Sequence, residues 1–151
     1  MDQNIWEYDD FIFKGDELKG MTQKGKDKVK VEGKTDLVIP ELTPDGLPLK
    51  KIADNAFYRR GLTSVVIPNT VESIGYDAFG VCKLKEVKLP EALVNIEGFA
   101  FYRNKLTKVE FGSKVKRLEP SSFAMNELPE LNLPESLEYI GASAFYKNAF
   151  E

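Results

Sequence analysis

The sequence predicts an α/β solenoid, rich in short strands, in which one small structural unit repeats along the chain. The first observation is a period of 22 residues that runs without gaps from 62 to 149 and defines four units. An earlier unit within residues 34–61 shares the pattern but carries about six extra residues. The second observation is a phenylalanine at the same place in every unit, which indicates a column inside a stack of five coils. These phenylalanines are Phe57, Phe79, Phe101, Phe123 and Phe145.

Each unit opens with a pattern typical of a short strand. In residues 84–89, LKEVKL, the apolar residues occupy inner positions, and Glu86 and Lys88 lie between them on the exposed side. The proline that follows, Pro90 in this unit, ends the strand because it has no N–H to donate to a ladder. We therefore expect one sheet along one side of the stack.

The second half of each unit is expected to form the opposite inner wall. In the unit that begins at Leu62, this wall comes from Val71, Ile74 and Phe79, as an extended piece followed by a single helical turn. A single coil cannot bury such side chains alone, so neighbouring coils have to stack. The position of Ile74 is apolar throughout, at Ile52, Ile74, Ile96, Leu118 and Ile140.

The full repeat pattern, LxxVxIPxxVxxIGxxAFxxC, is most complete in residues 62–82 and resembles the bacterial BspA-like, or Treponema-type, leucine-rich repeat. The resemblance covers residues 34–151. It implies a right-handed leucine-rich repeat solenoid without enzymatic activity, which acts as an adhesin-like module on a bacterial surface or after secretion. The expected partners are proteins of the host or of a bacterial surface. No signal or anchor is recognisable in this sequence, so the location rests on the resemblance alone.

Residues 1–33 are predicted to form a β-hairpin cap on the solenoid of residues 34–151. Short strand-like runs alternate there with glycine turns at Lys14-Gly15 and Lys24-Gly25. A solenoid needs such a lid to cover the apolar end of its first coil. The candidates for covering it are Trp6, Phe11, Ile12 or Phe13.

Four lysines alternate along residues 24–30, and a strand would present them on one face. Such a face could bind a polyanion. The valines at 29 and 31 favour instead an ordinary amphipathic strand with solvated lysines. The four are Lys24, Lys26, Lys28 and Lys30.

The other end of the array shows no lid in this sequence. Phe150 occupies the place where the leucine of a sixth coil belongs, so we expect a fragment of a longer array, truncated at its C-terminal end. The alternative is end-to-end self-association through the uncapped last coil, because an open strand edge beside apolar surface favours pairing.

Composition argues against several classes of function. The formal net charge is -3 and the pI is near 5.2, so no overall positive field attracts nucleic acid. No apolar run is long enough for membrane insertion. The absence of histidine removes a member of the usual catalytic triads and zinc sites. We therefore expect no catalytic residues, no cofactor and no metal.

The exposed face of the predicted sheet is the first candidate for binding a protein. A rigid face avoids the cost of ordering on binding, and Val38 and Val66 offer a small apolar foothold. Alternatively, the alternating charges form ion pairs between strands, at about 0.2–1 kcal/mol each, and bind nothing. The candidate residues are Ser64, Val66, Glu86, Lys88, Lys108, Glu110, Glu130 and Asn132.

A flank lined by Tyr58, Tyr102 and Tyr146 is the second candidate. Each tyrosine follows a repeat phenylalanine and has a basic residue beside it. Spaced aromatic rings could stack on sugars, and the cations could recognise acidic glycans or cell-wall polymers. The alternative is that these rings cover the adjacent coil. A rigid spacer without a ligand is the third interpretation.

Cys82 is the only cysteine and the one candidate nucleophile. It occupies a slot, three residues after the phenylalanine, that asparagine fills in the next three units. We therefore predict a buried thiol of low reactivity, not a catalytic group. The slot holds Arg60, Cys82, Asn104, Asn126 and Asn148.

Overall fold

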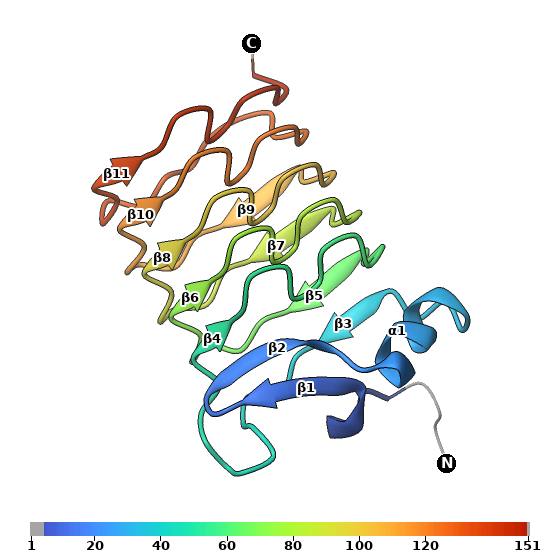
Figure 1. The fold of residues 1–151 in the computed structure, drawn as a ribbon. Helices are drawn as coiled ribbons and strands as arrows, with labels where there is room; N and C mark the ends of the chain where they lie inside the picture. The colour runs from blue at the N-terminus through green and yellow to red at the C-terminus, as the bar shows by residue number, and fades with distance from the viewer. Residues whose placement is uncertain (1–4, 151) are drawn as a thin grey trace.

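The structure is a computed structural model that describes residues 5–150. It is an elongated stack of coils with the N-terminal segment packed on one end (Figure 1). The elements are η1 (Tyr8–Asp10), β1 (Phe11–Lys14), β2 (Glu17–Met21), α1 (Gln23–Lys30), β3 (Asp36–Val38), β4 (Lys51–Ile52), β5 (Ser64–Val66), β6 (Ser73–Ile74), β7 (Glu86–Lys88), β8 (Asn95–Ile96), β9 (Lys108–Glu110), β10 (Arg117–Leu118) and β11 (Tyr139–Ile140).

The principal sheet is open and has seven strands, in the order β1-β2-β4-β6-β8-β10-β11. After the antiparallel β1–β2 pair, every pairing is parallel. The register aligns the predicted apolar column, since Ile74 lies beside Ile52 on one side and Ile96 on the other. Backbone bonds recur with it: Gly75 N–H donates to the Ile52 carbonyl at 2.8 Å, and Glu97 N–H to that of Ile74 at 3.0 Å.

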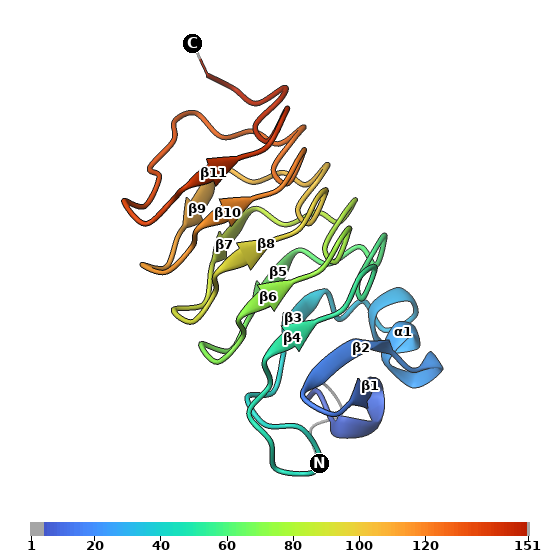
Figure 2. The same cartoon turned by 60° about the vertical axis from the view of Figure 1, so that its left-hand side comes forward.

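This continuous sheet lies on the side opposite to the predicted one (Figure 2). The strands expected from the LKEVKL pattern do form, as β3, β5, β7 and β9, but they pair only two by two, β3 with β5 and β7 with β9. Residues 130–132, expected to be the next strand, are not a strand. The segments expected to be merely extended carry the unbroken ladder instead.

The predicted phenylalanine column is confirmed. Consecutive rings from Phe57 to Phe145 lie between 5.2 and 5.7 Å apart at their centroids, and their planes are within 16° of parallel. Phe79, Phe101 and Phe123 are completely buried. Each of these three inner rings therefore packs against the rings of the coils before and after it, and the column forms the centre of the core.

The single helical turn expected at each phenylalanine is not formed. Asp77 and Val81, on either side of Phe79, both have a φ of 53°, in the left-handed region, so the chain makes consecutive tight turns. The Phe79 N–H donates to the Ala100 carbonyl of the next coil at 2.8 Å. An α-helix would direct that donor four residues back along the same chain. Hydrogen bonding between coils has replaced hydrogen bonding within a helical turn.

The asparagine column joins neighbouring coils through its side-chain amides. Asn104 Oδ1 accepts from the Leu84 N–H at 3.0 Å. Its Nδ2 donates to the carbonyls of Phe79 and Phe101 at 2.9 and 3.1 Å. The next two asparagines repeat the same bonds one and two coils further on. The slot thus satisfies backbone groups at the turn that precedes each new strand.

Cys82 occupies the same slot and is a buried thiol, as predicted. Only 5% of the residue is exposed, and its Sγ donates to the Phe57 carbonyl at 3.2 Å. Burial raises the pKa of the Cys82 thiol above its ordinary value. Less thiolate forms as a result, and the thiolate is the reactive species.

The N-terminal segment contains the predicted hairpin and one unpredicted helix. β1 and β2 are joined by a turn at Gly15, whose φ is 58°. β2 then pairs in parallel with β4, so the hairpin extends the principal sheet. Among the residues expected to cover the first coil, Phe11 is buried, Trp6 and Phe13 are partly buried against the core, and Ile12 is exposed.

Residues 24–30, predicted to be a strand after a turn at Lys24-Gly25, lie in α1. Thr22 caps this helix, since its Oγ1 accepts from the Gly25 N–H at 3.2 Å. Helical spacing then buries Gly25, Lys28 and Val29 on one side, and the alternating lysines no longer share a face. A Cβ at Gly25 would collide with the Asp10 carbonyl oxygen, so only glycine allows this close approach.

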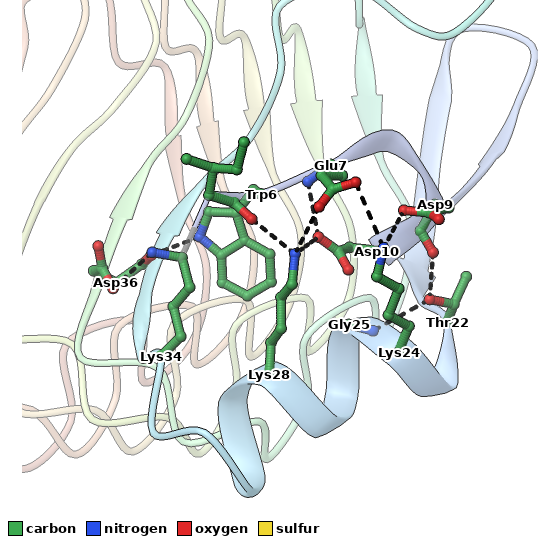
Figure 3. A network of polar contacts seen from close by, with 11 residues as sticks. Trp6, Glu7, Asp9, Asp10, Thr22, Lys24, Gly25, Lys28, Lys34 and Asp36 are labelled. Carbon is green, nitrogen blue, oxygen red and sulfur yellow. Dashed lines mark hydrogen bonds and ion pairs between the residues drawn. The ribbon is translucent and has the colours of Figure 1, made fainter. Parts of the chain in front are cut away.

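A buried ion pair fastens α1 to the segment before β1 (Figure 3). Lys28 Nζ lies 2.6 Å from Asp10 Oδ2, with both side chains almost fully buried, and also donates to the Ile5 carbonyl at 2.7 Å. The Trp6 Nε1–H donates to the Asp36 carbonyl in β3 at 2.8 Å. These contacts tie the N-terminal segment to the first strand of the repeats.

We expect Phe101→Ala to lower the free energy of unfolding by about 3–5 kcal/mol, because it leaves a cavity between two stacked rings. Urea unfolding followed by circular dichroism measures this change. Phe150→Ala is the control, because Phe150 is 40% exposed and its loss should cost less than about 1 kcal/mol. Equal stabilities of the two variants would refute the phenylalanine column as the main source of stability.

We expect Cys82→Asn to keep the free energy of unfolding within about 1 kcal/mol of the parent, because its amide can make the bonds that Asn104 makes one coil later. Cys82→Leu, which fills the slot without a polar group, should lower it by about 1–3 kcal/mol. In the parent protein, a thiol reagent should label Cys82 far more slowly than a free thiol. Labelling at the free-thiol rate contradicts the buried environment.

Candidate interaction surface

The eight residues predicted for the exposed sheet face lie on one side of the stack. We call this side the β3–β9 face, meaning the outer surface of β3, β5, β7, β9 and residues 130–132. All eight side chains are exposed. One hollow on this face is lined in part by Ser64, Val66, Glu86, Lys88, Lys108 and Glu110. An adjoining hollow shares Lys108 and Glu110 with the first and includes Glu130 and Asn132.

The charged side chains of this face do not form the ion pairs expected between strands. Glu86 lies beside Lys108, and Lys88 beside Glu110, in the register of β7 and β9. The ion pair found there runs along β9, from Lys108 Nζ to Glu110 Oε1 at 3.1 Å. Among residues 5–150, Glu86 and Lys88 have no ion-pair partner, so their charges remain available to a ligand.

The apolar foothold lies at the N-terminal end of the same face. Val38 and Val66 are side by side in the β3–β5 register and are 48% and 59% exposed. Val38 also borders an apolar hollow formed with Trp6, Tyr8 and other residues of the N-terminal segment. The face therefore combines an apolar end with a charged middle.

The hollow at the C-terminal end of this face has an apolar floor and a volume of about 490 Å³. Val109, Phe111 and Phe145 line it and are partly buried. Leu131, which the strand pattern would turn inward, is 40% exposed. These residues were not among the predicted site residues. The one sequence feature that sets this coil apart is Pro129, where the two preceding coils have Lys85 and Thr107.

The tyrosine flank is mostly occupied by contacts within the protein. Arg59 Nε donates to the Tyr58 hydroxyl at 3.0 Å and the guanidinium lies over its ring. The Tyr102 ring meets the Phe99 ring edge-on, with centroids 5.0 Å apart. Of the three tyrosines, only Tyr146 is open to solvent, at 56% exposure. The structure therefore does not join them into one open surface.

The described residues show no arrangement suited to metal binding. Within residues 5–150, no group of three or more cysteine, aspartate or glutamate side chains is placed to hold a metal ion. No helix in this part of the chain has the length and apolar character needed to cross a membrane.

The fold is similar to that of a solved leucine-rich repeat protein. The leucine-rich repeat protein of T. pallidum is 28% identical, with a TM-score of 0.76, over 92% of this chain and 64% of that chain. This chain thus matches less than two thirds of that protein's length. A leucine rich cell surface protein from Faecalibacterium prausnitzii A2-165 is 20% identical, with a TM-score of 0.43, over 93% of this chain and 53% of that chain. A leucine-rich repeat protein from Bacteroides capillosus ATCC 29799 is 21% identical, with a TM-score of 0.46, over 89% of this chain and 86% of that chain.

No curated protein matches the sequence. Residues 50–151 match the family described as BspA type Leucine rich repeat region (6 copies). This match covers more than half of the chain and includes every repeat phenylalanine. The chain therefore belongs to the BspA-type leucine-rich repeat family.

Proposed function

We propose that this chain is a non-enzymatic, adhesin-like interaction module that binds protein partners through the β3–β9 face. The observation that carries this proposal is the gathering of eight exposed residues along two adjoining hollows on one rigid face. Membership of a repeat family supports it, because solenoids build extended binding surfaces from stacked units.

Preorganisation is the proposed mechanism of binding. The inward side chains Val65 and Val87 of this face belong to the same core cluster as the stacked phenylalanines, so little backbone has to be ordered when a partner arrives. The unpaired charges of Glu86 and Lys88 would select the partner and align it. The apolar pair Val38 and Val66 would supply contact area beside them.

The proposal also includes the number of coils, the handedness of the solenoid and the location of the protein. We take residues 34–151 as five coils of a right-handed solenoid and residues 1–33 as its N-terminal cap. Display on a bacterial surface, or secretion, follows from the resemblance to surface proteins of this family. End-to-end association through the last coil remains a hypothesis, motivated by the exposure of Leu133 and Ile140 there.

Glycan binding by the tyrosine flank is the weaker alternative. Tyr58 and Tyr102 already pack against Arg59 and Phe99. Tyr146 is exposed, but Lys147 Nζ lies over its ring. A rigid spacer without a ligand is the interpretation that remains if neither surface binds.

Charge reversal on the face tests the proposed function. We expect the double variant Glu86→Lys, Lys88→Glu to weaken binding by about tenfold or more, because it misaligns the charges presented to a partner. Surface plasmon resonance against a panel of purified extracellular-matrix and bacterial surface proteins measures the effect on any protein that the parent chain binds.

The matched control is Lys116→Glu, Glu138→Lys, near β10 and β11 on the opposite side of the stack. Both residues are exposed, and the net charge again stays constant. If both doubles weaken binding equally, or if neither does, the β3–β9 face is not the binding surface.

A further inference from the structure

We infer that the hollow between β9 and residues 128–132 binds an extended peptide segment of a protein partner, which pairs with the exposed edge of β9. This inference rests on the proposed function and names the kind of segment that one part of the β3–β9 face takes. An interrupted ladder, an apolar floor and an unpaired carboxylate support it.

The ladder of this face is interrupted after β5, where Lys85 keeps its N–H, and again after β9. In the coil of β9, the Thr107 N–H donates to the Lys85 carbonyl of the coil before it at 2.9 Å. The Thr63 N–H makes the same bond to the Thr35 carbonyl at 2.9 Å. The corresponding residue one coil after Thr107 is Pro129, which has no N–H to give. No backbone hydrogen bond joins residues 107–111 to 128–132 in the described chain.

The missing bonds leave one edge of β9 open. The Glu110 carbonyl faces β7, since it accepts from the Leu89 N–H at 2.8 Å. Successive backbone groups of a strand point to opposite edges, so the N–H and C=O of Val109 face the hollow. An open strand edge pairs readily with another extended segment, and several peptide-binding domains use this mode.

The hollow beside this edge offers an apolar floor to such a segment. Its volume of about 490 Å³ lies within the range of ordinary ligand sites. Side chains on one side of an extended peptide would enter the apolar floor at Val109, Phe111 and Phe145. The floor therefore favours a peptide with apolar residues at alternate positions.

The charges at the rim of the hollow select the peptide residues that lie between the apolar ones and point outward. Lys108 and Glu110 neutralise each other in an ion pair. Within residues 5–150, Glu130 has no ion-pair partner and is exposed, so the rim carries an uncompensated negative charge. Lysine or arginine at the outward positions of the peptide would complement it. The segment is thus expected to alternate apolar and basic residues.

The direct probe is a fluorescent synthetic peptide of sequence Lys-Val-Lys-Val-Lys-Val, with its charge-reversed counterpart Glu-Val-Glu-Val-Glu-Val. Fluorescence anisotropy with the full chain gives both affinities. We expect the lysine peptide to bind at least about tenfold more tightly, and we expect Glu130→Lys to reverse this preference. Two further peptides, N-methylated at odd or at even positions, each lose the backbone donors of one edge, and at least one should bind about tenfold more weakly.

Pro129→Thr tests whether the missing donor contributes to the open edge. Threonine restores the donor, so we expect residues 130–132 to pair with β9 and the lysine peptide to bind about tenfold more weakly. Pro129 is exposed, so the change leaves the core intact. The control is Pro44→Thr at an exposed loop position far from the hollow, which should bind the peptide as the parent does.

Equal binding of all lysine peptides, or equal affinity of Pro129→Thr and the parent, overturns the inference. Failure here is separable from failure of the proposed function. If the peptide results fail while reversal at Glu86 and Lys88 still weakens a protein partner, only the inference falls. If the peptides behave as expected while that reversal has no effect, the proposed use of the wider face falls.

Discussion

The coils of this protein satisfy their backbone mainly by hydrogen bonding to one another, and the rest of the structure depends on that constraint. Donors that an α-helix would use within its own turn, such as the Phe79 N–H, reach the carbonyls of the next coil. The spacing that these bonds impose allows the phenylalanine rings to stack at 5.2–5.7 Å. Any interruption of the repeat therefore appears on the surface as an unpaired strand edge or a hollow.

The repeat itself could be predicted from the sequence because the same residue types recur at a constant spacing. The phenylalanine and isoleucine columns, the buried Cys82 and the hairpin turn at Gly15 follow from periodicity and residue type. The side that carries the continuous sheet could not be read, since a two-residue strand such as β6 leaves no pattern in the sequence. α1 was missed because Lys24 to Lys30 alternate as a strand would, whereas the Thr22 cap and the contact of Gly25 with Asp10 favour a helix.

The candidate site, too, could be predicted from the sequence only in part. Which residues are exposed on the β3–β9 face follows from strand alternation, and all eight predicted side chains are exposed. Strand alternation did not predict their ion pairs, because Lys108 pairs with Glu110 along its own strand and not with Glu86 across the strands. The hollow beside β9 could not be read from the sequence either, because Pro129 removes one donor there but the ladder also breaks between β5 and β7, where Lys85 has its N–H.

Amide hydrogen exchange at Val109 tests most directly the claim that the β3–β9 face has an open edge. Val87 is the internal reference: it is the valine one coil earlier, and its N–H points to β9, as the bond from Leu89 N–H to the Glu110 carbonyl shows for the same edge. We predict that the Val109 amide of the free protein exchanges much faster than that of Val87 and slows when the lysine peptide is added. Equal protection of the two amides in the free protein would contradict it.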